Sequence, residues 1–83
     1  MQDVYIIEYI DRSTEKESKS IIALVHERAE VDIFMCGVEW RKDPWGSSQY
    51  VISFEVNHYK RDEIGLMTKV QTLDFSHLKP LTQ

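Results

Sequence analysis

Three histidines and one cysteine are the side chains in this sequence best suited to bind a metal or to act as a nucleophile. No two histidines are four residues apart, as two ligands on one helix face would be, and a lone cysteine can form neither a paired-cysteine zinc site nor an internal disulfide. The cysteine follows Phe34 and Met35, so we expect a buried thiol rather than a reactive one. The sequence therefore predicts no metal site, no cofactor and no enzymatic activity. The four residues are His26, His58, His77 and Cys36.

Acidic side chains occur as close pairs, but each pair lies in a charged segment. General acid–base catalysis needs a carboxyl group whose pKa is tuned by burial or by a neighbouring charge, and we expect these pairs to stay in solvent. The glycines are too scattered for a loop that binds phosphate through backbone amides. Nucleotide hydrolysis is not supported. The acid pairs are Glu15/Glu17, Glu27/Glu30 and Asp62/Glu63, and the glycines are Gly37, Gly46 and Gly65.

The segment 40–50 is rich in the residue types that dominate binding hot spots, which are Trp, Tyr and Arg. Within it, 43–46 reads Asp-Pro-Trp-Gly, with Pro and Gly at the second and fourth positions of a type I turn. Trp45 at this reversal either folds back over the sheet or faces a partner, while Trp40 is expected to lie in a strand. The partner-binding candidates of this segment are Trp45, Arg41, Lys42, Tyr50 and Trp40.

A second candidate surface is the polar end of the next strand, where Tyr59 and Arg61 stand near Asn57 and Lys60. Tyr5 and Tyr9 are possible additions to it. Aromatic and basic residues on an open sheet can stack and bind single-stranded RNA. The net charge of −4 and the absence of an RNA-recognition motif argue against this. We favour ordinary cross-strand packing of the tyrosines.

Hydropathy predicts neither secretion nor membrane insertion. No basic region precedes the first apolar run, and the longest aliphatic stretch, 21–25, is far shorter than the roughly 20 residues of a membrane span. A single cysteine suits a reducing compartment. We expect a cytoplasmic protein.

Strand patterns cover much of the chain. Residues 4–10 are β-branched and aromatic, a charged loop follows over 11–18, and 21–25 is apolar at consecutive positions. This second strand is therefore expected to be central or buried on both faces and to pair antiparallel with the first. Residues 50–59 alternate with period two, 60–65 reads as a turn, 66–73 as a strand, and the tail after Asp74 as irregular.

Residues 26–36 are ambiguous between a helix and a strand. The helical alternative places Ala29, Ile33 and either Cys36 or Gly37 on one side and ends near Gly37, which is expected to take the left-handed cap conformation. We prefer the helix. The alternative is an all-β meander.

With 83 residues, the chain is expected to form one α+β domain, an antiparallel sheet of about five strands with one short helix packed on one face. One short helix does not cover a whole sheet, so the remaining apolar face is expected to bind a homodimer partner or another protein. The leading hypothesis is a small non-enzymatic regulator or inhibitor of a larger protein, of a style common among phage and mobile-element products. The alternatives are a homo-oligomeric small-ligand or nucleotide-binding protein and a single-stranded nucleic-acid-binding module.

Overall fold

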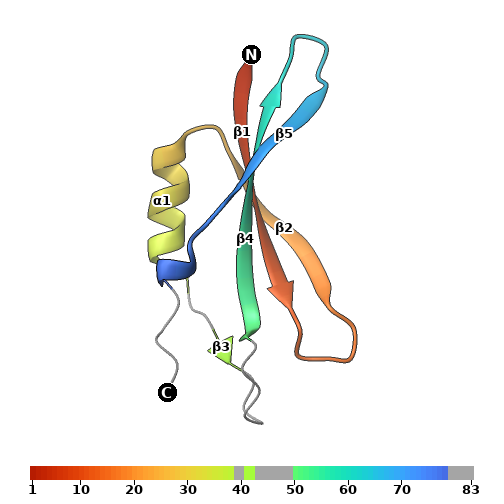
Figure 1. Ribbon diagram of the computed structural model, residues 1–83, viewed down its shortest axis with the longest axis vertical. Helices are drawn as coiled ribbons and strands as arrows, with labels where there is room; N and C mark the ends of the chain where they lie inside the picture. Colours follow the sequence, from red (N-terminus) through yellow and green to blue (C-terminus); the bar gives the residue numbers. More distant parts are fainter. Residues whose placement is uncertain (39–40, 43–49, 79–83) are drawn as a thin grey trace.

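The computed structural model describes residues 1–38, 41–42 and 50–78 and has the expected α+β architecture (Figure 1). A helix on one face of an antiparallel sheet confirms the preferred interpretation, and the all-β meander is wrong. The elements are β1 (Gln2–Asp11), β2 (Ser18–Val25), α1 (Arg28–Cys36), β3 (Arg41–Lys42), β4 (Tyr50–Arg61), β5 (Met67–Leu73) and a 3-10 turn, Ser76–Leu78.

The five described strands occupy four positions across the sheet, in the order β2-β1-β4 and then β3 or β5. All pairings are antiparallel, which confirms the expected hairpin of β1 with β2. β4 pairs with β1 along one edge, while its other edge pairs first with β3 and then with β5. β3 and β5 therefore follow one another along a single edge of β4.

β1 and β4 pair without a register shift from Gln2 opposite Arg61 to Asp11 opposite Ile52. Because side chains alternate across a strand, this regular pairing defines two faces. The helix-side face carries Tyr5 and Ile7 and lies toward α1 (Figure 1). The opposite face carries Ile6, Glu8, Glu55, Asn57 and Tyr59, and we call it the open face because the described residues place no helix over it.

The core fills the space between the helix-side face and α1. Ile7, Val31 and Val56 have no exposed surface, and Met35 is 1% exposed. Burial of such side chains is the main force holding the helix to the sheet. The buried cluster is Tyr5, Ile7, Val31, Met35, Val56, Leu73 and Phe75.

The inner side of α1 differs from the expected one. Val31 and Met35 are buried, and Phe34 and Val38 pack against the core, which is the i, i+3, i+4, i+7 spacing of a helix face. The side predicted to face inward consists of Ala29, Ile33 and either Cys36 or Gly37, and all four of these residues are exposed.

The helix ends at Gly37 as expected, but not in the expected conformation. Gly37 has φ −100° and ψ 1°, so it is not left-handed, and its N–H donates to the carbonyl of Phe34 at 3.1 Å. A tight final turn thus replaces the left-handed cap.

β2 is an edge strand, so the expectation of a central or doubly buried strand is wrong. Ala23 and Val25 pack against the core, whereas Ile21, Ile22 and Leu24 are exposed. A β-bulge explains the consecutive apolar run: Ala23 lies opposite Ile7 and Ile21 opposite Glu8, which leaves Ile22 as the extra residue.

The segment after β5 is also more ordered than expected. Phe75 is 7% exposed and belongs to the core, and the 3-10 turn that follows places Leu78 against the same cluster. Arg28 on α1 lies 5.6 Å over the Phe75 ring, a cation–π distance that ties the segment to the helix.

The β4–β5 connection is a turn, as expected, but it covers residues 62–66 rather than 60–65, because Lys60 and Arg61 belong to β4. Asp62 accepts hydrogen bonds at Oδ1 from the backbone N–H groups of Ile64 (3.0 Å) and Leu66 (2.9 Å). Gly65 has φ +91°, a conformation that glycine adopts without the steric cost of a Cβ atom. The turn is therefore fixed by one carboxylate and one glycine.

Candidate interaction surface

The sequence candidates of segment 40–50 are only partly described. Trp40 and Trp45 lie outside the described residues, and for Arg41, Lys42 and Tyr50 the structure describes the backbone alone. Lys42 pairs with Tyr50 and Arg41 with Ile52, antiparallel, so the chain reverses between β3 and β4 as predicted. The two alternatives for Trp45, folding back over the sheet or facing a partner, concern a residue outside the described ranges.

The second candidate surface is divided between the two faces of the sheet. Tyr59 is half-buried and shares the open face with Asn57 and Arg61, whereas Lys60 lies opposite Asp3 on the helix-side face. Tyr5 and Tyr9 also lie on the helix-side face. Tyr5 stacks on His58 with ring centroids 4.4 Å apart, and Tyr9 meets Phe54 edge to face at 5.6 Å. Tyr59 and Arg61 therefore lie on the opposite face from Lys60, Tyr5 and Tyr9, so these residues do not form the single surface that was expected.

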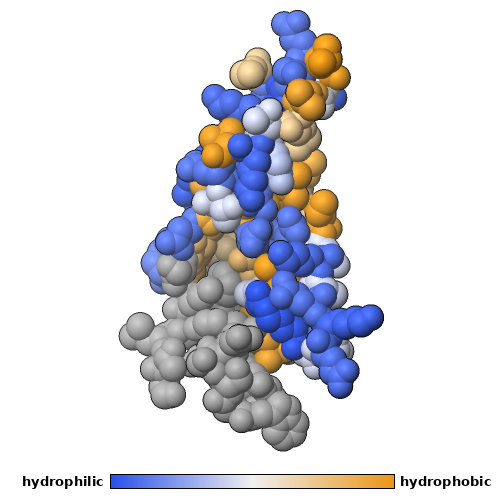
Figure 2. All heavy atoms as spheres, turned by 45° about the vertical axis from the view of Figure 1, so that its right-hand side comes forward, coloured by the Kyte–Doolittle hydropathy of each residue, from blue (hydrophilic) through white to orange (hydrophobic). Residues whose placement is uncertain are grey.

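Exposed apolar side chains gather on the two outer strands. Ile21 is 66% exposed and Leu24 52% exposed on β2, and Met67 and Val70 are exposed on β5. Figure 2 shows hydrophobic side chains along one margin of the molecule, among charged ones. These two groups lie at opposite edges of the sheet, with β1 and β4 between them. Exposed apolar surface in a small domain is typical of an interaction site.

A polar network occupies the middle of the open face. Asn57 is 3% exposed and donates through Nδ2 to Glu55 Oε1 at 3.0 Å, while its Oδ1 accepts from the Thr72 hydroxyl at 2.7 Å. Glu8 is the cross-strand partner of Glu55, and its Oε1 lies 3.5 Å from the same amide.

Two carboxylates thus face each other across the β1–β4 pair. Among the described residues, neither forms an ion pair with a lysine or arginine. Directly opposed like charges are unfavourable in a sheet, so a cation added to this site would relieve their repulsion.

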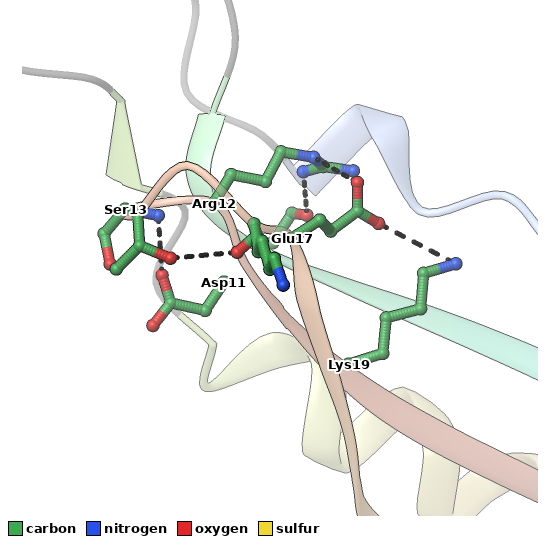
Figure 3. Close-up of polar contacts among 8 residues, drawn as sticks. Asp11, Arg12, Ser13, Glu17 and Lys19 are labelled. Atoms are coloured by element: carbon green, nitrogen blue, oxygen red, sulfur yellow. Dashed lines mark hydrogen bonds and ion pairs between the residues drawn. The ribbon is translucent and has the colours of Figure 1, made fainter.

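A cluster of charged side chains, Arg12, Glu17 and Lys19, links the residues of the β1–β2 turn next to this face (Figure 3). Glu17 lies between two bases, with Oε2 3.3 Å from Arg12 Nε and Oε1 3.9 Å from Lys19 Nζ. Arg12 also donates through Nη1 to the Ser53 hydroxyl on β4 at 3.0 Å. The hydroxyl and backbone N–H of Ser13 hold the pKa of Asp11 below its usual value.

The metal-ligand and nucleophile candidates do not converge. Cys36 is exposed, so the predicted burial of its thiol is wrong. His26 and His77 are exposed and His58 is buried, and no three His, Cys, Asp or Glu side chains among the described residues are placed to hold a metal. An open hollow of about 370 Å³ at the β4–β5 turn is lined by Met1, Asp62, Glu63 and Ile64. The carboxylate of Asp62 already accepts two hydrogen bonds from backbone N–H groups of the turn.

Sequence reasoning missed the exposed β2 edge and the Glu8–Glu55 pair. The acids were not singled out because their opposition depends on the pairing of β1 with β4, whose residues are about 50 positions apart. The apolar run 21–25 predicts a central or doubly buried strand, whereas Ile21, Ile22 and Leu24 are exposed.

No helix within the described ranges is both long enough and apolar enough to cross a membrane. Comparisons of the chain with protein-family models, with curated proteins and with solved structures found no match, so no family and no function follow from similarity.

Proposed function

We propose that the chain is a small non-enzymatic protein-binding module, a regulator or inhibitor of a larger protein. The observation that carries this proposal is the open face, where exposed apolar side chains of the outer strands flank the Glu8–Glu55 pair. A single cysteine, exposed and free, suits action in the cytoplasm.

The partner expected for this face combines apolar residues with a basic group. The apolar residues would cover side chains such as Met67, which lies opposite Arg61 on the open face, and the basic group would neutralise the opposed carboxylates. The 40–50 segment, with Trp45, is the second expected contact region because of its residue types.

The test places a photo-crosslinking amino acid at Tyr59 on the open face and, as a control, at Ile33 on the exposed side of α1. Both proteins are irradiated in a nuclease-treated native lysate, and the cross-linked products are identified by mass spectrometry. We expect one protein to cross-link at position 59 and not at 33. Equal cross-linking at both positions, or none, contradicts the proposal.

The captured protein is then purified and titrated against three variants. Glu8→Gln with Glu55→Gln and, separately, Trp45→Ala should weaken binding, the first pair most strongly at low salt. The matched control is Glu15→Gln with Glu30→Gln, which removes the same charge from exposed positions off the open face. If the control weakens binding as much as Glu8→Gln with Glu55→Gln, the open face is not the site.

A further inference from the structure

Among the described strands, β2 forms one edge of the sheet. It pairs with β1 on one side, and no described strand lies on its other side (Figure 1). Natural proteins protect such an edge with proline, charged residues or a covering segment, since unpaired backbone N–H and C=O groups bind other strands. Between Ser18 and Val25 the only charged residue is Lys19, and there is no proline. The edge is long, apolar and suited to strand addition.

We propose that β2 pairs antiparallel with β2 of a second copy of this chain, about a two-fold axis between Ile21 and Ile22. In this register all eight residues of each strand are paired. The axis brings Ile21 and Ile22 of both copies together. It also sets Lys19 opposite Leu24 of the second copy, where the aliphatic part of the lysine side chain covers the leucine. The eight strand positions of two sheets would form one continuous sheet.

The bulge in β2 makes this register possible. In a regular strand, residues an odd number apart face opposite sides, so an axis between two neighbours would pair side chains on opposite faces. Here the extra residue reverses the alternation. Lys19 lies opposite Ile10 and Leu24 opposite Ile6, so both are on the open face although they are five residues apart.

The same agreement holds for the other pairs. Ser20 lies opposite Tyr9 and Ala23 opposite Ile7, on the helix-side face. Ser18 and Val25 are also both on that face, opposite Asp11 and Tyr5. In these three pairs, on either side of the central Ile21–Ile22 pair, each residue therefore meets a residue of the same face, and a shift of one position destroys this agreement.

The charges that flank β2 are complementary in this register. Just beyond the paired strands, Glu17 comes near His26 of the second copy and Lys16 near its Glu27; all four residues lie outside β2. A shift of one residue brings like charges together: Glu17 opposite Glu27 one way, and Glu15 opposite Glu27 the other way. Opposite charges across an antiparallel pair favour it and like charges disfavour it.

The first test measures the oligomeric state of the purified full-length chain by sedimentation over a series of concentrations. We expect a monomer–dimer equilibrium and no larger species. Ile22→Lys places two ammonium groups beside the axis and should raise the dissociation constant at least about tenfold, since like charges meet in a desolvated centre. Ile33→Lys, the same change on the exposed side of α1, should leave it unchanged. Circular dichroism checks that both variants fold, as their exposed positions predict.

A chain that is monomeric at every concentration overturns the proposal, and so does a dimer that Ile22→Lys leaves intact. Neither result bears on the larger-protein partner, because no other protein is present in this experiment.

The second test reads the register by disulfide cross-linking in a Cys36→Ser background. Lys19→Cys and Leu24→Cys are made in separate chains, mixed and oxidised, and should form a covalent heterodimer, because directly opposed residues fall within disulfide range. The control mixes Lys19→Cys with Ile22→Cys, about 7 Å out of register. Equal yields from the two mixtures contradict the two-fold register.

The third test exchanges flanking charges. Lys16→Glu sets two acids opposite each other and should weaken the dimer, whereas Lys16→Glu combined with Glu27→Lys restores opposite charges and should recover it. If the double variant is as weak as the single one, the flanking pairs do not form.

Discussion

Asp3 and His58 are joined by a hydrogen bond across the β1–β4 pair, with Nε2 of the imidazole 2.9 Å from Oδ1 of the carboxylate. A carboxylate only accepts hydrogen bonds, so Nε2 carries the proton. The imidazole also stacks on Tyr5, and its Nδ1 is buried without a described partner. The hydrogen bond from His58 is the main cause that lowers the pKa of Asp3, against a smaller rise from desolvation.

This pair predicts a pH-dependent contribution to stability. A carboxyl group with a lowered pKa in the folded state stabilises above its unfolded pKa, about 3.9, and loses that contribution as the pH falls through the folded value. We expect Asp3→Asn to be less stable than the wild type near neutral pH and the difference to shrink below about pH 4. Urea unfolding at several pH values measures it. In a His58→Phe background, where the donor is missing, Asp3→Asn should have little effect; an undiminished effect there would show that another group lowers the pKa.

The inner side of α1 gives a second prediction. Met35 is 1% exposed and Ile33 is 75% exposed, two residues away on the same helix. Met35→Ala should lower the free energy of unfolding by about 2–5 kcal/mol because it leaves a cavity. Ile33→Ala, the control, should change it by less than about 0.5 kcal/mol. Similar losses in the two variants, measured by chemical denaturation, would contradict the observed helix face.

The two described glycines give opposite predictions. Gly65 has φ +91°, so Gly65→Ala should destabilise the fold by about 1–2 kcal/mol through backbone strain, although an added Cβ meets only the Arg61 side chain at 3.5 Å. Gly37 has φ −100°, and an added Cβ lies at an ordinary 3.7 Å from the Phe34 carbonyl oxygen. Gly37→Ala should be neutral or slightly stabilising, because it restricts the unfolded chain. Thermal unfolding compares the two variants. Clear destabilisation of Gly37→Ala would indicate that Gly37 adopts the left-handed cap conformation after all.

Asn57 gives the fourth prediction. Its buried side-chain amide forms hydrogen bonds with Glu55 and Thr72. Asn57→Ala leaves those two groups without this partner and should lower the free energy of unfolding by about 1–3 kcal/mol. A double-mutant cycle of Asn57→Ala with Thr72→Val measures the coupling, for which we expect about 0.5–1.5 kcal/mol. Additive losses would mean that the 2.7 Å bond contributes nothing to stability.

The local elements could be predicted from the sequence because their signals are local. Alternation marked β4, and the turn between β4 and β5 was evident from its charged residues and glycine. The inner face of α1 could also be predicted, because Val31, Phe34, Met35 and Val38 have helical spacing. The prediction that used Ile33 selected the exposed side of the helix instead.

The position of β2 at the edge of the sheet could not be predicted from local sequence patterns. Consecutive apolar residues are typical of a buried strand, and only the pairing with β1 shows that a bulge turns Ile21 and Ile22 outward. The same long-range pairing creates the Glu8–Glu55 pair. Features of the candidate surface thus depend on which strands become neighbours, which local patterns do not determine.

The long β1–β4 pairing also sets the order in which the chain can fold. The β1–β2 and β4–β5 hairpins close over short loops and can form within microseconds, whereas β1 and β4 pair over much longer sequence separations, from Asp11–Ile52 to Gln2–Arg61, which costs more loop-closure entropy. That pairing step creates the helix-side face on which α1 packs. We expect it to be the rate-limiting step of folding, so that substitutions at Ile7 and Val56, opposite each other in this pairing, slow folding more than those in either turn.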